Sequence, residues 1–411
     1  MDVGPLKESP AFRRFFAGSA LSSVGSQMTN FAVPLQVFTL THSSAAVGAV
    51  GLAIAVPAVT LGLLGGTVVD AVDRRKLVLG LTSGAAGVSG LLAAQAFAGL
   101  GQLWPLYLLV AVQSVLNSMN APARRTFLPR LLSVERVPAG AALTMFVMHA
   151  SVIGGPALAG VITAAWGLKV CYLIDAISFA AALYGVGQLP PMPPQGDTVA
   201  RPGPRAVAES LRFIRGRPVL TGALLADMSA TVLGMPFAVF PAVNAEHFGG
   251  AAQTLGLLMA APSVGGVIGM ALSGPVGHVA RPGRAMLVCG AVWGAGLAGF
   301  GLANQLWLAM LLLAVAGAGD ATSVVFRTTM IQTATPDGQR GRVSAAEYVV
   351  GAGCPQLGNF RAGMVATATT PALSAVIGGV ATILGAAAIG VAIPGFRRYR
   401  TVRTVDTTAA V

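Results

Sequence analysis

The chain has 411 residues, of which 55% are hydrophobic and 10% are charged. Soluble domains carry roughly 25% charged residues, so this composition excludes an ordinary soluble protein and indicates a membrane protein with many spans. The formal net charge of +12 would suit a nucleic-acid-binding protein. In a twelve-helix arrangement with both termini inside, however, nearly all basic residues fall on one side, with Lys169 and Arg361 as exceptions. This pattern argues against nucleic acid and predicts cytoplasmic termini.

Motifs for several kinds of chemistry are missing from the sequence. Cys171, Cys289 and Cys354 each lie in an apolar segment without a CxxC spacing, so neither a disulfide framework nor a metal site is expected. No lysine follows a glycine, which excludes a P-loop, and HExxH and GxSxG motifs are absent. We therefore expect no enzyme and no cofactor, and any transport would draw on an ion gradient or on the cargo's own gradient.

Charge-free apolar runs predict an all-α membrane protein with twelve spans. No small-residue cleavage site precedes the first run, so we expect an uncleaved first helix. The proline-rich, basic segment 190–217 reads as a cytoplasmic linker between N-terminal (1–189) and C-terminal (218–394) six-helix halves, followed by a cytoplasmic tail at 395–411. The predicted spans lie at about residues 12–40, 47–70, 77–98, 103–122, 138–165, 169–189, 218–245, 252–276, 285–303, 306–330, 343–368 and 372–394.

The loop between the second and third predicted spans carries a compact charge cluster. Gly66 is followed by Asp70 and then by Arg74 and Arg75. This spacing resembles the loop between helices 2 and 3 of the major facilitator superfamily of transporters, although Asp73 stands where that family usually has a glycine. The resemblance implies the major facilitator fold and a gating role for Gly66, Asp70, Arg74 and Arg75. The alternative is a solvated turn that only fixes topology.

The second half contains a degraded copy of this loop. The segment from Gly274 to His278 repeats the spacing of Gly66 to Asp70, with His278 in the place of the aspartate. Parallel repetition of six-helix halves is what the superfamily's fold predicts, with a substrate site at their interface near mid-membrane.

Helix 5 contains a second motif of this superfamily. Gly155 and Pro156, followed by Gly160, are similar to the Gly-Pro motif associated with its antiporters. This motif implies a bend or a close helix contact that limits leak, and the alternative is ordinary small-residue packing.

Three further stretches narrow the resemblance to one branch of the superfamily. Pro34–Gln36, Ala280–Gly283 and Gln332–Val343 resemble the branch of enterobactin (siderophore) exporters and macrolide-efflux proteins. The resemblance runs from Phe12 to about Pro394. It implies export of a siderophore, enterobactin-like, with a multidrug or macrolide efflux antiporter as the alternative.

Ionisable residues inside the predicted spans are the main candidates for proton coupling, because a charge near mid-bilayer costs at least about 2.5–3.5 kcal/mol and needs a partner. For Asp227 we favour proton or substrate handling over a structural hydrogen bond. For Asp320 the preference is reversed, since Arg327, two turns on, is a plausible counter-ion, although each is also able to pair with another helix. His149 is by default a neutral, hydrogen-bonded imidazole, with pH sensing as the alternative. Asp175 is expected to be solvated near the outer surface.

By the same resemblance, helices 1, 4, 7 and 10 line a central cavity. The polar candidates for its walls are few and mostly neutral, so the cavity should favour a bulky, largely apolar cargo with some hydrogen-bonding groups. A strongly anionic cargo would need more buried arginine than the sequence supplies. Glu347 and Arg361 are expected near the membrane interfaces. The cavity candidates are Gln27, Asn30, Gln36, Gln113, Asn117, Asn120, Arg327 and Gln356.

These observations predict a secondary transporter in the bacterial inner membrane that exports a small organic molecule by alternating access, coupled to proton entry. Its expected partners are the small-molecule substrate, protons and the lipid bilayer, and it is expected to work as a monomer. A non-transporting receptor or scaffold is a distant alternative, because the longest cytoplasmic stretch is the short 190–217 linker.

Overall fold

A computed structural model describes residues 2–71, 73–193, 212–274, 279–336 and 339–400 of the chain. For 61–71, 340–342 and 345 it describes the backbone alone. The residues so described form helices joined by short loops, with no strand among them. The predicted all-α fold is therefore confirmed, whereas most of the predicted linker and of the predicted tail lies outside the described ranges.

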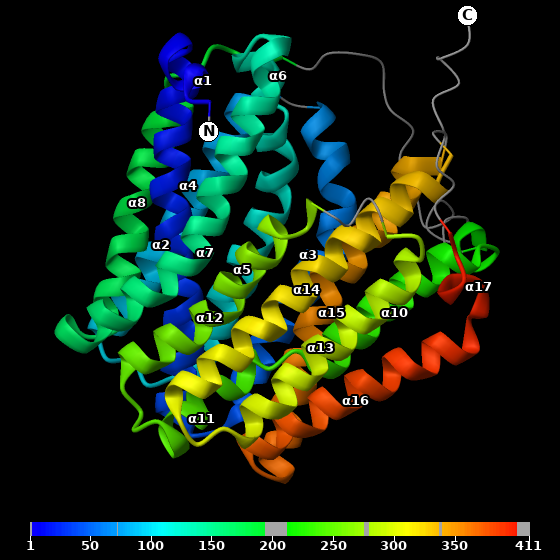
Figure 1. Cartoon of the computed structure of the whole chain (residues 1–411). Helices are drawn as coiled ribbons and strands as arrows, with labels where there is room; N and C mark the ends of the chain where they lie inside the picture. Colours follow the sequence, from blue (N-terminus) through cyan, green and yellow to red (C-terminus); the bar gives the residue numbers. More distant parts are fainter. Residues whose placement is uncertain (1, 72, 194–211, 275–278, 337–338, 401–411) are drawn as a thin grey trace, which may run out of the picture.

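The helices before residue 190, here called the N-half, appear on the left of Figure 1. Most of their bounds agree with the predicted spans within a few residues. In chain order the elements are α1 (Gly4–Glu8), α2 (Pro10–Thr41), α3 (Ser44–Ala71), α4 (Arg74–Phe97), α5 (Leu103–Arg125), α6 (Leu128–Leu131), η1 (Val134–Arg136), α7 (Val137–Trp166) and α8 (Lys169–Gly187).

The helices after residue 217 are here called the C-half, and most of them appear in the lower and right parts of Figure 1. They begin with a helix that is interrupted near its end. The elements are α10 (Pro218–Gly234), η2 (Phe237–Val239), α11 (Phe240–His247), α12 (Ala252–Ala271), α13 (Pro282–Leu302), α14 (Leu306–Ala334), α15 (Arg340–Ala368), α16 (Pro371–Ala392) and α17 (Pro394–Arg397).

Eight helical segments within the described ranges are long and apolar enough to cross a membrane. They are α4, η1 with α7, α8, α10 with η2 and α11, α12, α13, α14 and α16. The helices α2, α3, α5 and α15 are between 23 and 32 residues long. Their described parts do not meet the same criterion of length and hydropathy. Twelve spans therefore stay a prediction for those four helices.

The predicted span over 218–245 corresponds to the segment Pro218–His247, which is long and apolar enough to cross a membrane but is interrupted near its end. Helix α10 ends at Gly234, and Met235 adopts an extended backbone (φ −69°, ψ 118°) before the short turn η2 begins. Met235 precedes Pro236, and a residue before proline is pushed out of the helical region by the proline ring. The sequence signal was thus present in the Met235-Pro236 pair.

The two halves meet at the end of the bundle that lies away from the N-terminus. There α3 packs along α15, and α7 packs along α12. Glycines allow this close approach: a Cβ on Gly48 would meet the Asn359 carbonyl oxygen at 2.9 Å, and one on Gly256 would meet the Pro156 carbonyl oxygen at 2.5 Å. Backbones in contact through small residues are typical of tight helix pairs in membranes.

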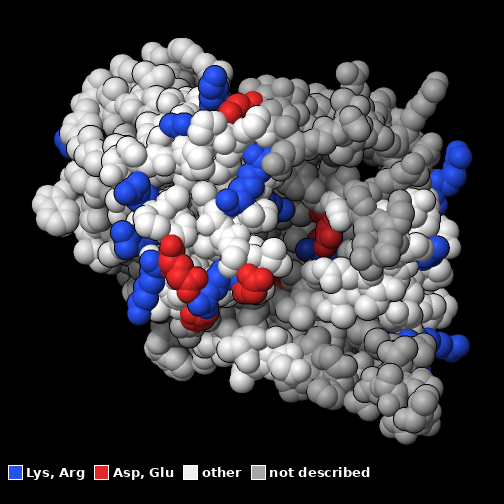
Figure 2. Space-filling view, turned by 90° about the horizontal axis from the view of Figure 1, so that it is seen from above, with Lys and Arg blue, Asp and Glu red and all other residues white. Residues whose placement is uncertain are grey.

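Toward the N-terminal end the halves diverge, as Figure 1 shows. Contact between α3 and α15 is described as far as Val59 and Gly353, about half-way along both helices. Viewed from above, the molecule is hollowed beside its centre, and acidic and basic side chains are visible inside the hollow (Figure 2). The fold is thus closed at one end and hollowed from the other.

Candidate functional site

Four charged side chains from three helices of the C-half lie together. Arg327 of α14 forms an ion pair with Asp227 of α10, and its Nε lies 3.5 Å from Oε1 of Glu347 on α15. Asp320, two turns before Arg327 on α14, interacts electrostatically with both Asp227 and Arg327. We call these four residues the acid cluster.

Burial decides the chemistry of the acid cluster. The side chains of Asp227 and Arg327 are only 8% and 12% exposed, and that of Glu347 is 25% exposed. Three carboxylates share one guanidinium, so the fully ionised cluster has an excess of two negative charges. In a poorly solvated site such an excess is relieved when a carboxylate takes up a proton or when a cation binds.

The helices place the acid cluster by simple spacing. Asp320 and Arg327 are seven residues apart, so they lie on the same face of α14. That face is turned to α10, which also packs against α15 and so brings Asp227 and Glu347 to the same point. The cluster therefore connects three helices of one half.

Sequence reasoning found three members of the cluster but assigned the pairing differently. Arg327 was expected to balance Asp320, and it pairs with Asp227 and Glu347 instead, which is the alternative of pairing between helices. Glu347 was expected near a membrane interface and was not a candidate. As an ionisable residue inside a predicted span, it carried the same signal that identified Asp227.

The expectation that Asp175 is solvated is wrong. Asp175 is 0% exposed, and its carboxylate accepts hydrogen bonds from Thr29 (2.7 Å), Ser89 (2.8 Å) and Ser26 (3.3 Å). These hydroxyl groups come from α2 and α4, which pack against α8, and Gly25 makes room for the Asp175 backbone. Depth along a predicted span says little about which way a side chain faces, because Asp175 faces the inside of the N-half.

Several of the cavity candidates are engaged within the N-half. Gln36 exchanges amide hydrogen bonds with Gln95 (3.2 and 3.1 Å) and accepts one from the Tyr172 hydroxyl (2.8 Å). Asn120 is buried and donates to Thr82 at 3.3 Å. These contacts hold both amides between helices of the same half.

Other cavity candidates are freer. Asn30 is exposed and donates to Gln27 at 3.0 Å, while Asn117 is exposed on α5. The Gln113 carbonyl oxygen is buried without a hydrogen-bond partner among the described residues. Gln356 accepts from the Asn359 amide at 3.4 Å and faces α3 at the contact between the halves. These amides are neutral and few, and their place in the walls of a cavity stays a prediction.

The predicted gating loop is described only in part. The side chains of Gly66 and Asp70 lie outside the described set, but Asp73, Arg74 and Arg75 lie within it. Asp73 caps α4 by accepting from the Lys76 N–H at 3.0 Å, and Arg75 donates to the Gly187 carbonyl. The loop is therefore fastened to α8 on the same half.

Asp73 also holds the start of the predicted linker. Its second carboxylate oxygen accepts from the Met192 N–H at 3.1 Å, while the Met192 carbonyl accepts from the Arg74 N–H at 3.0 Å. Burial works against ionisation of Asp73, but the N–H groups of Lys76 and Met192 outweigh it and hold its pKa below the usual range. In the sequence Asp73 departs from the family's glycine, but an aspartate just before a helix is also a typical N-cap signal.

The Gly-Pro motif of helix 5 lies at the contact between the halves. Gly155 leaves room for Gln27 of α2, and a Cβ on Gly160 would meet the Ala252 carbonyl oxygen of α12 at 2.6 Å. The predicted close helix contact is therefore present in the structure. His149, on the same helix, is partly exposed and has no hydrogen bond to any residue that the structure describes.

The described helices form a multi-pass membrane fold of the major facilitator type. The fold is similar to that of the nucleoside transporter NupG (TM-score 0.71, 16% identity, covering 93% of this chain and 98% of that one). It is also similar to a bacterial homologue of the iron transporter ferroportin in an inward-facing state (TM-score 0.65, 17% identity, covering 93% and 98%).

The chain belongs to the transmembrane secretion effector family, whose model matches residues 2–401. It is 29% identical to the enterobactin exporter EntS of Citrobacter koseri over 407 residues, which are 97% of this chain and 96% of that protein. It is also 29% identical to the enterobactin exporter EntS of Escherichia coli O81 over 409 residues, with the same coverage. The chain is therefore a transporter and not an enzyme.

Proposed function

We propose that the chain exports a siderophore of the enterobactin kind across the bacterial inner membrane in exchange for protons. The proposed cargo rests on the end-to-end similarity to enterobactin exporters, at 29% identity over 97% of the chain. Both termini lie in the cytoplasm, as the distribution of basic residues favours. One chain forms a complete transport unit, because the acid cluster and both halves come from a single chain.

Proton coupling rests on the charge balance of the acid cluster. A buried guanidinium with three carboxylates has an excess of negative charge, and protonation of Asp227 or Asp320 relieves it. Protonation of Asp227 weakens its ion pair with Arg327, so α10 and α14 are then free to shift against each other. This links proton binding to a movement of helices that line the centre of the bundle.

The shape of the molecule supports alternating access. Contacts between the halves are concentrated at the end away from the N-terminus, and the other end is hollowed (Figures 1 and 2). With cytoplasmic termini, this is the state that receives cargo from inside the cell. The glycine contacts of α3 with α15 and of α7 with α12 close the outer end and separate in the opposite state.

The charge balance of the acid cluster also supports a second class of cargo, apolar or cationic drugs. Arg327 is neutralised by Asp227 and Glu347, so it is not available for an anionic cargo. An acid-rich site with neutral amides around it suits an apolar or cationic drug better than a polyanion. Multidrug or macrolide efflux is therefore the alternative that the experiment has to separate.

Deletion of the gene in its host separates the two cargoes. Iron-starved deletion cells and their medium are assayed for siderophore, and the same cells are tested for macrolide sensitivity and for accumulated ethidium. Retained siderophore with unchanged drug sensitivity supports siderophore export. Increased drug sensitivity with normal siderophore secretion replaces it with drug efflux, and no change in either assay rejects both cargoes. Restoration by the natural chain, but not by an Asp227→Asn chain, ties the phenotype to this transporter.

A further inference from the structure

Four arginines line a single cavity at one end of the C-half. The cavity measures about 260 Å³, and its walls are Arg281 and Arg284 at the start of α13 with Arg397 and Arg398 at α17. None of the four forms an ion pair or side-chain hydrogen bond with any residue that the structure describes. Arg281, Arg284 and Arg398 are exposed to solvent. Like charges brought together without a partner repel, so this arginine pocket favours the binding of an anion.

The arginine pocket is held in place by packing. Phe396 of α17 is fully buried among Ala223, Met286, Phe326 and Met330. Gly283 leaves the space for this contact, since a Cβ there would collide with the Phe396 backbone. The four guanidinium groups therefore extend from two elements that are fixed to each other rather than from loose ends.

A second cavity adjoins the first along the outer face of the same half. It measures about 290 Å³, lies between α13 and α16, and shares Arg284 and Arg397 with the arginine pocket. Its other walls are apolar and include Leu287, Val288, Ile383, Ala387 and Val391. Val288 and Val391 are 62% and 76% exposed, so this apolar groove opens onto the surface that the spans present to lipid.

We propose that the arginine pocket and the apolar groove together form a binding site for one anionic phospholipid. The phosphate of the headgroup binds between the guanidinium groups, which match phosphate oxygens in paired hydrogen bonds. An acyl chain lies along the groove between α13 and α16. The pocket lies where α13 begins and α16 ends, which is the level at which a lipid headgroup meets a spanning helix.

The two cavities share Arg284 and Arg397, and this connection favours a lipid over a free ion as the ligand. Free phosphate would need the arginines alone and would leave the groove unused. A neutral or zwitterionic lipid would fill the groove but would bring no net negative charge to the four guanidinium groups. An anionic phospholipid is the occupant that uses both cavities, and none of its contacts involves the acid cluster.

Native mass spectrometry of the delipidated full chain, titrated with phosphatidylglycerol and with phosphatidylcholine, tests the charge requirement. The natural chain is expected to bind phosphatidylglycerol more tightly. Arg284→Gln with Arg397→Gln should weaken that binding by roughly 30-fold, the factor expected when two arginines near an anionic lipid are lost. The matched control is Arg13→Gln with Arg14→Gln, which removes two exposed arginines of α2 and should change the affinity little. Equal weakening by both pairs, or equal binding of the two lipids, overturns the proposal.

A third variant tests the groove. Ala387→Phe fills the groove without removing an arginine, so it should weaken phosphatidylglycerol binding while inorganic phosphate competes as it does with the natural chain. If Ala387→Phe changes nothing and inorganic phosphate displaces the lipid at equal concentration, the pocket binds free phosphate and the lipid site is rejected. Thermal melting in detergent checks that each variant is folded.

Discussion

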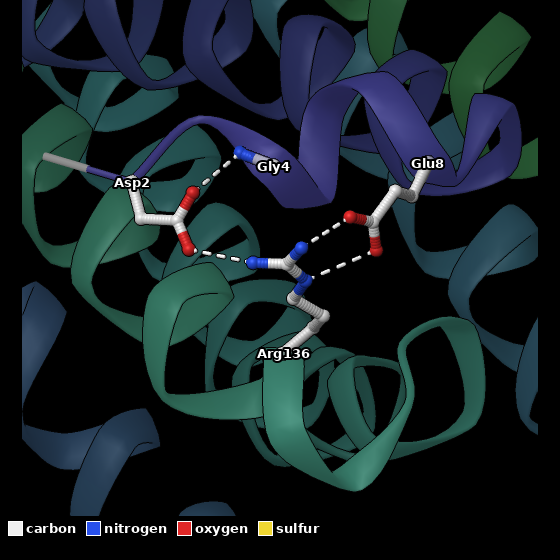
Figure 3. A network of polar contacts seen from close by, with 4 residues as sticks. All are labelled: Asp2, Gly4, Glu8 and Arg136. Carbon is white, nitrogen blue, oxygen red and sulfur yellow. Dashed lines mark hydrogen bonds and ion pairs between the residues drawn. The ribbon is translucent and has the colours of Figure 1, made fainter.

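Two arginines in this molecule each hold one aspartate and one glutamate, in very different surroundings. Arg136 bonds to Asp2 and Glu8 at the surface, where its side chain is 36% exposed and its partners 53% and 52% (Figure 3). Arg327 does the same inside the C-half with a side chain that is 12% exposed. The two networks contain the same types of charged group, but they differ in how much water reaches them.

The comparison shows that burial decides what an ion pair does. Water and salt screen the Arg136 network, so it ties α1 to the start of α7 with little net energy. In the acid cluster, removal of one partner leaves the others charged and poorly solvated. We therefore expect only the buried arrangement to couple a change of protonation to the packing of helices.

The largest effect is expected for Arg327→Gln. It leaves three carboxylates around a neutral amide, and breaking a buried pair in this way costs about 3–5 kcal/mol of unfolding free energy. Thermal melting of the purified chain should show a large decrease, and transport should be lost. Arg361→Gln is the matched control, because Arg361 lies on α15 without an ion pair among the described residues. If both variants lower the melting temperature by a similar amount, the acid cluster contributes no more to stability than an arginine without an ion pair.

Asp227→Asn is expected to abolish gradient-driven export while the protein stays inserted and folded. The amide cannot take up a proton, but Arg327 keeps Glu347 as a partner, so stability changes less than with Arg327→Gln. Proton release on addition of cargo, followed with a pH indicator in weak buffer, should disappear. Transport that stays unchanged at several external pH values would exclude Asp227 as a proton carrier.

Asp175→Asn tests whether a buried carboxylate without a cation behaves differently. Its three hydroxyl donors lose part of their acceptor, and hydrogen bonds between spans contribute about 0.6 to 1.7 kcal/mol each. We expect a moderate decrease in melting temperature with an unaltered dependence of transport on pH. If the pH dependence of transport changes as it does for Asp227→Asn, the N-half also takes part in proton transfer.

These sites also show how far the sequence can take the prediction. The all-α class, the helix bounds and the choice of Asp227 as a residue that needs a partner follow from apolar length and from the cost of charge in a membrane. The partner of Arg327 and the burial of Asp175 do not, because both depend on how each helix is rotated about its axis. Spacing within one helix predicts which residues share a face. Which neighbouring residues that face contacts is determined by how the helices pack.

A smaller effect is expected for Asp73, which is polar but lies outside the spans. Asp73→Ala removes the cap of α4, which costs about 1 kcal/mol. The folded pKa of Asp73 is below its usual value, so its contribution is present above pH about 4 and is lost as pH falls through the folded pKa. Melting curves of the natural chain and of Asp73→Ala should therefore converge in acid. Asp73→Asn keeps a side-chain oxygen for the cap, so its melting temperature should stay near that of the natural chain and should not depend on pH in this way. If the melting curves of the natural chain and of Asp73→Ala already coincide at neutral pH, the charge of Asp73 does not contribute to stability.

The smallest effect is expected for Arg136→Gln, the surface counterpart of Arg327→Gln. The hydrogen bond from the Gly4 N–H is the main cause that holds the pKa of Asp2 below its usual range, and Arg136 adds to it, so Asp2 stays ionised without the arginine. Both carboxylates are exposed and are solvated by water once the guanidinium is gone. We expect a slight decrease in melting temperature at low salt that disappears at high salt, with transport unchanged, and Arg136→Lys should restore most of the difference. A decrease as large as that of Arg327→Gln would show that α1 is a structural clamp and that exposure is not what separates the two arginines.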